Sequence, residues 1–291
     1  MMCFRSFLFL TLESKFLSFI ISTDRRNLNV YGEGGGMNFG NLDRANLRTG
    51  LIDGHVHLSE IEHSKRTVEN AVKSGVKRMI AVAMDLDSCR KNLALADRFP
   101  GNVLPAVGYH PGSIQAEDVD DTLVFITQNL HACVALGEVG LDYKVKVKKK
   151  LQKAVFSKLL KIAVETHKPV IVHSRFSYQR TYEMVAEAGV EKAVFHWYSG
   201  PAEILDKIIA RGFFVSATPA LAYSPHHQAA MERAPMERIL IETDAPVQYG
   251  DRRSEPADLH KTLFHLSRIK KIPGNTLAGM VTKNAERFFG L

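Results

Sequence analysis

The sequence predicts one α/β domain folded as a (β/α)8 TIM barrel. Short β-rich runs alternate with helix-forming stretches from residue 51 to the end of the chain. Several of these runs, such as residues 169–172, are uninterrupted apolar segments, which is typical of parallel strands buried on both faces. Eight strand and helix pairs in roughly 240 residues match the usual size of such a barrel. The competing fold is an open doubly wound sheet, which often carries a glycine-rich phosphate loop after its first strand; here that place is taken by Asp53-Gly54-His55-Val56-His57.

The expected elements follow one another along the chain in a regular alternation. The strands are expected at residues 51–53, 76–84, 103–108, 133–138, 170–173, 193–196, 213–217 and 239–244. The helices are expected near residues 65–74, 86–98, 118–130, 150–167, 178–188, 202–211, 226–234 and 257–269, with a closing helix near 275–288. A helix between successive strands allows the strands to lie parallel.

The composition restricts the class of protein. The chain has 291 residues, of which 45% are apolar and 24% are charged, with a single tryptophan. These fractions exclude a disordered, collagenous or membrane-embedded chain and indicate a soluble globular protein. The 38 lysine and arginine residues outnumber the 31 acidic residues, and the net charge of +7 is compatible with an anionic partner.

Residues 1–49 are expected to be an N-terminal extension and residues 50–291 the barrel domain. Two apolar clusters lie within residues 4–21, but Glu13 and Lys15 separate them. A membrane-spanning helix needs about 20 mostly apolar residues, and a signal peptide needs a single apolar region followed by small residues at a cleavage site. Neither is expected here, and no membrane partner is expected.

The segment Gly32-Glu33-Gly34-Gly35-Gly36 directly precedes Met37. Its codons form a purine-rich tract of the kind found at ribosome-binding sites in prokaryotic genes. We therefore expect Met37 to be the native start, with residues 1–36 either a translated leader or an artefact of an upstream start codon, and the extension as a whole non-native or disordered.

Cysteine usage predicts a reducing compartment, and thus a cytoplasmic location. The cysteines are odd in number and widely separated, and no CxxC pair occurs among them. We expect free thiols, two of them buried, at Cys3, Cys89 and Cys133. A monomer is favoured.

Side chains that bind metals follow five of the eight expected strands. Active sites of (β/α)8 barrels lie at the carboxyl ends of the strands. In an extended segment His55 and His57 point the same way, because side chains two residues apart share a face. A single histidine at a strand end is usually a hydrogen-bonded structural residue, but coincidence at five strand ends indicates a metal site. The predicted ligands are His55, His57, Glu138, His173, His196 and Asp244.

There are more predicted ligands than one catalytic ion binds, because such an ion typically has three protein ligands and an open position. A bridging Glu138 would serve two divalent cations, with His55 and His57 completing one site and His173 and His196 the other. Two ions about 3.5–4 Å apart stabilise both the attacking and the leaving oxygen of a displacement. The candidate ions are Mg, Mn and Zn, and the imidazoles favour Zn, Mn or Fe over Mg.

Taken together and in order, the motifs resemble the TatD family of metal-dependent hydrolases of the amidohydrolase superfamily, over about residues 50–291. The motifs are Asp53-Gly54-His55-Val56-His57-Leu58, Gly108-Tyr109-His110-Pro111, Gly137-Glu138-Val139-Gly140-Leu141-Asp142, His173-Ser174-Arg175, His196-Trp197-Tyr198-Ser199-Gly200, Glu242-Thr243-Asp244-Ala245-Pro246, Glu255-Pro256 and Asn284-Ala285-Glu286-Arg287-Phe288-Phe289.

The resemblance implies a TIM barrel with a two- or three-metal centre and metal-dependent deoxyribonuclease activity, including 3′→5′ exonuclease trimming. It implies the same six metal ligands, and it implies that His110 and Arg175 contact the substrate phosphate or the transition state. Because Glu138 occupies the fourth strand, the carbamylated lysine of many amidohydrolases is not expected.

The expected reaction is phosphodiester hydrolysis by metal-activated water. Asp244 would orient the water and accept its proton, and Glu138 would act beside it as a catalytic metal ligand. Arg175 offers a planar bidentate partner for a phosphate oxygen, and His110 can donate to the developing charge.

Several neighbouring residues have two interpretations each. Asp53 either orients a ligand histidine or caps the following turn. Glu255 marks the start of a helix with proline at its first position, or contacts the site. Trp197 and Tyr198 either stack on a base or pack under the loop.

Six lysines follow the fourth strand closely: Lys144, Lys146, Lys148, Lys149, Lys150 and Lys153. They form either an ordinary solvated helix entrance or an electrostatic collar that attracts a polyanion. DNA or another phosphate-bearing substrate is therefore the expected partner. The alternative activities are hydrolysis of a carboxylic ester, lactone or amide, including an aminoacyl-tRNA, and a non-enzymatic scaffold with vestigial ligands.

Overall fold

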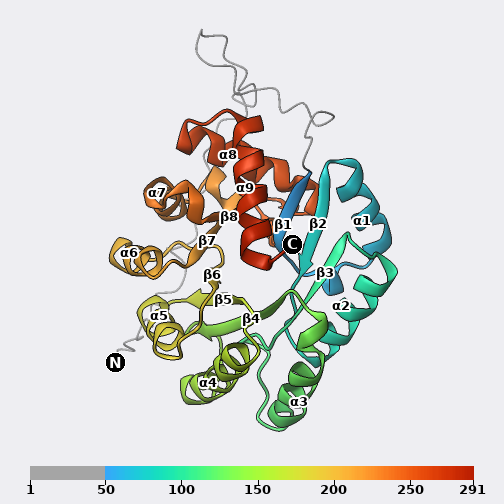
Figure 1. The fold of residues 1–291 in the computed structure, drawn as a ribbon, viewed down its shortest axis with the longest axis vertical. Coiled ribbons are helices and arrows are strands. Elements are labelled where there is room, and N and C mark those ends of the chain that lie inside the picture. The colour runs from blue at the N-terminus through green and yellow to red at the C-terminus, as the bar shows by residue number, and fades with distance from the viewer. Residues whose placement is uncertain (1–49) are drawn as a thin grey trace, which may run out of the picture. The chain divides into compact units, whose positions relative to one another are not determined.

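A computed structural model describes residues 50–291, in which eight parallel strands form a ring covered by helices (Figure 1). The strands follow one another around the ring in chain order, from β1 to β8. Two backbone hydrogen bonds join the two ends of the sheet, from Asp244 N to His55 O at 3.0 Å and from His57 N to Ala245 O at 2.8 Å. The predicted (β/α)8 barrel is therefore confirmed.

The strands of the barrel are short and mostly buried. They are β1 (Leu51–Val56), β2 (Val76–Ala81), β3 (Val103–Val107), β4 (Ala135–Asp142), β5 (Val170–Arg175), β6 (Ala193–Phe195), β7 (Phe214–Ala217) and β8 (Ile239–Ile241). A two-stranded hairpin of β9 (Gln248–Tyr249) and β10 (Arg252–Arg253) follows β8.

Helices connect successive strands and cover the outside of the barrel. They are α1 (Ser64–Lys73), α2 (Leu86–Arg98), α3 (Val119–Asn129), α4 (Lys149–Glu165), α5 (Tyr178–Glu187), α6 (Ala202–Ala210), α7 (Pro225–Arg233), α8 (Leu259–Lys270) and α9 (Gly274–Phe289). Short 3-10 turns include η4 (Pro219–Ala222) and η6 (Pro256–Asp258).

Each predicted strand and helix is present, and the differences lie at the ends of the elements. β1 continues through His55 to Val56, and β4 continues past Glu138 to Asp142. β8 instead ends at Ile241, because the chain leaves the extended conformation before Asp244, whose φ is 51°. These shifts change which predicted ligands lie within strands and which lie just beyond them.

The interior of the barrel has its own apolar cluster, and α9 closes one end of it. Each of the eight strands contributes at least one side chain to it, including Ile52, Ile171 and Leu240. Phe288 and Phe289 at the end of α9 pack against this cluster, and Figure 1 shows the C-terminus at the centre of the ring. A second, larger cluster fills the space between the strands and the surrounding helices.

Some expectations concern residues outside the described range. The leader, the start at Met37, the apolar segment at residues 4–21 and the thiol of Cys3 all lie outside residues 50–291. Within that range, Cys89 and Cys133 are free and buried, as predicted. No helix of the described part is long and apolar enough to cross a membrane.

Candidate metal centre

The side chains predicted as metal ligands converge at the carboxyl ends of the strands. They come from β1, β4, β5 and the segments that follow β1, β6 and β8, and all but His173 are buried. Parallel strands of a barrel end on the same face, so residues distant in sequence meet there. The converging residues are His55, His57, Glu138, His173, His196 and Asp244.

The first cluster consists of His55, His57, Asp244 and one carboxylate oxygen of Glu138. The Nε2 atoms of the two histidines lie 3.2 Å apart. Asp244 Oδ1 lies 3.4 Å from His55 Nε2 and 3.2 Å from His57 Nε2. Glu138 Oε2 lies 3.4 and 3.5 Å from the same two nitrogens. Four potential ligand atoms thus surround one small volume.

These five separations match those between ligand atoms around one divalent cation. Ligand bonds of about 2.0–2.1 Å in tetrahedral geometry place the ligand atoms about 3.3–3.4 Å apart. Asp244 Oδ1 is also buried without a hydrogen bond of good geometry, and a buried carboxylate oxygen normally has a partner. Both the donor set and the unpartnered oxygen therefore suit a metal ion at this cluster.

The second cluster consists of His173, His196 and the other carboxylate oxygen of Glu138. Glu138 Oε1 lies 2.6 Å from His173 Nδ1 and 2.9 Å from His196 Nε2. The two nitrogens lie 3.2 Å apart. The two oxygens of Glu138 therefore face two different groups of ligands, which is the placement expected of a carboxylate shared between two ions.

Two acidic side chains hold the histidines of the second cluster in place. Asp142 Oδ2 lies 3.2 Å from His173 Nε2, and Glu242 Oε1 lies 3.4 Å from His196 Nδ1. Glu242 Oε1 also accepts a hydrogen bond from the backbone N–H of Trp197. Such partners fix the orientation of a ligating imidazole and raise its basicity. Both carboxylates lie within the sequence motifs that carry the predicted ligands, and this position was the signal by which their role could have been predicted.

Asp53 does not contact an imidazole ring. Its carboxylate accepts hydrogen bonds from the backbone N–H of Thr243 at 3.0 Å and from the Thr243 hydroxyl at 2.5 Å. Burial raises the pKa of Asp53 to about 8, although these hydrogen bonds and a third, from the backbone N–H of His55 at 3.4 Å, favour the ionised form. The contact with His55 N fits the expected cap of the following turn, and the contacts with Thr243 also link β1 to the segment that carries Asp244.

His110 lies beside the second cluster, with Nε2 3.7 Å from Glu138 Oε1. Burial lowers the pKa of its imidazole to about 3, so the ring is neutral at physiological pH. The backbone N–H of Gly112 donates to Nδ1 at 3.0 Å, and in the neutral ring the proton is therefore on Nε2. His110 presents an N–H donor to the site rather than a positive charge.

The charges of the two clusters depend on one another. Burial opposes ionisation of Glu138, but His196, His110 and the other imidazoles hold its pKa well below the usual value. Burial likewise opposes the ionised form of Asp244, and the contact with His57 lowers its pKa. In return, these carboxylates overcome the effect of burial and raise the pKa of His57 to about 8. Both carboxylates are therefore ionised at neutral pH and able to bind cations.

All residues of the two clusters except the fully buried His55 line a cavity of about 1530 Å³, hereafter the active-site cavity. Arg175, at the end of β5, lines it, and its guanidinium makes no hydrogen bond or ion pair within residues 50–291. Ligand cavities typically measure about 300–1,000 Å³, so the volume of this cavity is larger than that of a typical small-molecule site. The cavity offers a free cationic group to an anionic substrate.

Residues 144–153, hereafter the lysine-rich segment, border the active-site cavity, but none of their lysines lines it. Tyr143 and Val145 face the cavity, and the lysines that alternate with them are exposed. Lys149 lies over the ring of Tyr143, with Nζ 4.4 Å from the ring centre. The positive charge is therefore next to the cavity mouth, in solvent.

Trp197, Tyr198 and Glu255 differ in their access to the site. Trp197 lines the active-site cavity. Tyr198 is only 1% exposed, and its hydroxyl donates to Pro201 O at 2.7 Å, so the packing interpretation holds for it. Glu255 directly precedes the turn η6, with proline at the first position, as expected for a helix start.

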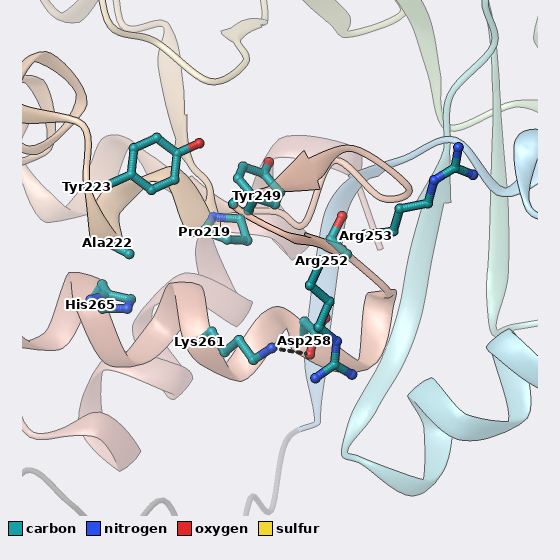
Figure 2. A pocket seen from close by; sticks show the side chains of 11 residues that line it. Pro219, Ala222, Tyr223, Tyr249, Arg252, Arg253, Asp258, Lys261 and His265 are labelled. Atoms are coloured by element: carbon teal, nitrogen blue, oxygen red, sulfur yellow. Dashed lines mark ion pairs between the residues drawn. The ribbon is translucent and has the colours of Figure 1, made fainter. Parts of the chain in front are cut away.

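A second cavity, of about 230 Å³, lies against η4, α8 and the hairpin β9–β10. Figure 2 shows Tyr223 and Tyr249 on one side of this cavity and the Lys261–Asp258 ion pair on the other. Tyr223 lines both cavities. The two cavities are therefore neighbours.

A (β/α)8 barrel that gathers imidazoles and carboxylates at its strand ends has the architecture of a metal-dependent hydrolase. The family profile of the TatD related DNases matches residues 52–290. The chain belongs to the TatD family and is a hydrolase of phosphodiester or other ester bonds, which confirms the family expected from the sequence.

Individual relatives agree with this assignment. The chain is 29% identical over 259 residues to the protein named deoxyribonuclease TATDN3 of Homo sapiens, covering 82% of this chain and 94% of that protein. It is 28% identical to an uncharacterised metal-dependent hydrolase of Methanocaldococcus jannaschii, covering 82% of this chain and 96% of the relative. The crystal structure of YJJV, a TatD homologue from Escherichia coli, shares the fold with a TM-score of 0.76 at 23% identity, covering 83% of this chain and 98% of that one.

Proposed function

We propose that this protein is a deoxyribonuclease that uses two divalent cations per chain and removes nucleotides from the 3′ end of DNA. The placement of Glu138 supports this proposal most strongly, because its two carboxylate oxygens face two separate ligand clusters 2.6–3.5 Å away. Two-metal sites are well suited to displacement at phosphorus.

In this proposal His55, His57 and Asp244 hold one ion and His173 and His196 the other, with Glu138 shared. The ions, Mg, Mn or Zn, would lower the pKa of a bound water and neutralise charge on the phosphate. The four imidazoles favour Mn or Zn over Mg.

The remaining chemistry is carried by side chains of this chain. Asp244 is ionised, and it orients the attacking water and accepts its proton. His110 donates its Nε2 proton in a hydrogen bond to a phosphate oxygen as charge develops there. Arg175 binds a second phosphate oxygen through its free guanidinium. Asp244 and His110 begin in the states that the structure favours at neutral pH, an ionised carboxylate and a neutral imidazole.

The surroundings of the active-site cavity support a polyanionic substrate. The lysine-rich segment borders the mouth, and a cluster of positive charge raises the local concentration of DNA. The free, buried thiols of Cys89 and Cys133 suit a reducing location such as the cytoplasm. We further propose that the barrel of residues 50–291 acts as a monomer.

The decisive experiment uses metal-loaded protein and end-labelled single- and double-stranded DNA, RNA and an aminoacyl-tRNA, each with and without chelator. The proposal predicts metal-dependent release of mononucleotides from the 3′ end of DNA. Release from the 5′ end would reverse the proposed polarity. Deacylation of the tRNA without cleavage of DNA would replace the proposal with a carboxylic ester hydrolase.

A further inference from the structure

Two exposed aromatic rings lie at the rim of the active-site cavity. Phe176 is 68% exposed and Tyr223 is 57% exposed, more than any other large apolar side chain in residues 50–291. Both line the cavity that contains Glu138 and His173. Single exposed apolar residues are ordinary on protein surfaces. Here, however, the two most exposed large apolar side chains of residues 50–291 line the same cavity.

The backbone holds the ring of Phe176 in its exposed position. Its φ is 54°, a conformation that bulky residues rarely adopt and that persists only where the surrounding structure enforces it. The residues on both sides are anchored: Arg175 O accepts a hydrogen bond from Tyr143 N at 2.9 Å, and the hydroxyl of the buried Ser177 donates to Leu141 O at 2.6 Å. The exposure of Phe176 therefore belongs to the fold.

Tyr223 is held at the corner between η4 and α7. Its backbone N–H donates to Ala220 O at 3.0 Å. The next residue, Ser224, caps α7 by accepting from His227 N. Phe176 follows β5 and Tyr223 follows the end of β7, so the two rings come from loops on opposite sides of the loop after β6, which carries Trp197. Figure 2 shows the ring of Tyr223 standing clear of α8.

Neither exposed ring has a partner within the described part of the chain. Other aromatic rings there pair with one another, as Trp197 does with Tyr249 at 5.4 Å between ring centres. Phe176 and Tyr223 form no such pair and no cation–π contact among the described residues. Their faces are thus available to a flat aromatic ligand that reaches the cavity.

We infer that Phe176 and Tyr223 are the side chains on which unpaired bases of the DNA stack at the rim of the active-site cavity. The inference rests on the proposed function and assigns these two residues to base binding. Stacking on aromatic side chains accepts any base, because every base has a π-face. Bases within a duplex are already stacked and paired, so they present no free face to these rings.

The test compares two oligonucleotides that differ only in their bases. One is ordinary single-stranded DNA, and the other carries abasic residues at the two 3′-terminal positions. For the wild type, loss of both bases should raise KM about 100-fold, which is about tenfold for each stacked base and lies in the lower part of the range for stacking. Phe176→Leu and Tyr223→Leu keep apolar bulk but lose the aromatic face, and each should raise KM for ordinary DNA about tenfold while kcat stays within about twofold.

Three controls separate stacking from a structural effect. Phe176→Trp should retain the wild-type KM, because it restores an aromatic face. Val124→Ala, at an exposed site on α3, should change nothing. On the abasic substrate, the two leucine variants should equal the wild type. Equal losses on both substrates, or wild-type KM in both leucine variants on ordinary DNA, would overturn the inference.

A binding measurement keeps this inference distinct from the proposed activity. Fluorescence anisotropy with labelled single-stranded and duplex DNA reports affinity whether or not the metal-loaded protein cleaves. If no DNA is cleaved, the proposed function fails, yet tenfold weaker binding of single strands by both leucine variants would still support the stacking site. Equal affinity of the wild type for blunt duplex and single strand would refute it.

Discussion

Imidazoles from four strand ends, those of β1, β3, β5 and β6, meet around the carboxylate of Glu138. Its two oxygens face different clusters, and its pKa is held well below the usual value despite burial. A buried charge is costly unless it is paired, so the clusters depend on each other's ionisation. Individual side chains of this site therefore have effects on both charge and metal binding.

Replacement of Asp244 by asparagine tests its role in proton transfer. Asp244→Asn preserves size and removes the negative charge, so we expect turnover to fall by about 10²–10⁴-fold with little loss of thermal stability. Activity should be measured at saturating metal, alongside thermal unfolding. Asp251→Asn, at an exposed position, is the matched control. Wild-type turnover in Asp244→Asn would disprove the assigned role.

Metal affinity should rise with pH. In the metal-free protein the pKa of His57 is raised to about 8, and those of His173 and His196 are also raised. Below these pKa values the imidazoles are protonated, and a metal ion must displace the protons. We expect affinity to increase between pH 6.5 and 8.5, by up to about tenfold per pH unit for each proton released. Titration calorimetry in buffers of different ionisation enthalpy measures both quantities, and a pH-independent affinity would contradict the expectation.

At the scale of elements, the close approach of β4 and β5 positions His173 beside Glu138. Gly140 makes this approach possible: its φ is 156°, and a Cβ atom there would lie 1.9 Å from His173 O. No side chain fits between backbones at that distance. The geometry of the second cluster thus depends on a residue that carries no side chain.

Gly140→Ala should therefore disturb both stability and metal binding. We expect the free energy of unfolding to fall by at least about 3 kcal/mol, with weaker binding of the second ion. Chemical denaturation and metal analysis measure the two effects. Gly279→Ala in α9, where a Cβ atom meets no neighbour, should leave metal binding unchanged and stabilise by up to about 1 kcal/mol. Similar behaviour of the two variants would refute this account of β4 and β5.

At the scale of the whole molecule, one end of the barrel carries the candidate metal ligands and the other is closed by apolar packing. The carboxyl ends of the strands hold the ligands, and α9 packs Phe288 and Phe289 against the apolar interior. The site therefore lies on a scaffold that is closed by the last helix of the chain. Stability and catalysis can be altered separately at these two ends.

Phe288→Ala should lower stability without changing the chemistry of the folded protein. Its ring is 1% exposed, and removal of a buried phenylalanine ring costs about 3–5 kcal/mol. We expect kcat to stay within about twofold at a temperature where the variant is folded. Denaturant unfolding and steady-state kinetics check the two parts. A large loss of kcat with intact stability would show that α9 is coupled to the site.

The lysine-rich segment should contribute long-range attraction of DNA. Changing Lys148, Lys149 and Lys150 together to glutamine should flatten the salt dependence of kcat/KM on DNA, because fewer counterions are released. The measurement is kcat/KM between about 50 and 200 mM salt. The same change in Lys65, Lys73 and Lys283, which are exposed and lie outside α4 and the segment before it, is the control. Identical slopes in wild type and the first variant would leave the segment as a solvated helix entrance.

Much of the fold and the identity of the candidate ligands could be predicted from the sequence, because both follow from local patterns. Apolar runs at regular intervals predicted every strand of the barrel, and polar residues after them predicted which side chains converge. The strand ends were less predictable. β4 continues past Glu138 and β8 stops before Asp244, because pairing with neighbouring strands, not local composition, decides where a strand ends.

The sequence by itself determined the fold class, the family and the set of candidate ligands, since these depend on residue types and their order. Only the tertiary structure decided how the ligands divide around Glu138, why Asp53 contacts Thr243, which tautomer His110 adopts, and that Phe176 and Tyr223 rather than Tyr198 offer free rings. The physical reason is that these properties depend on distances between residues brought together from different strands, and on burial, which a linear pattern does not contain.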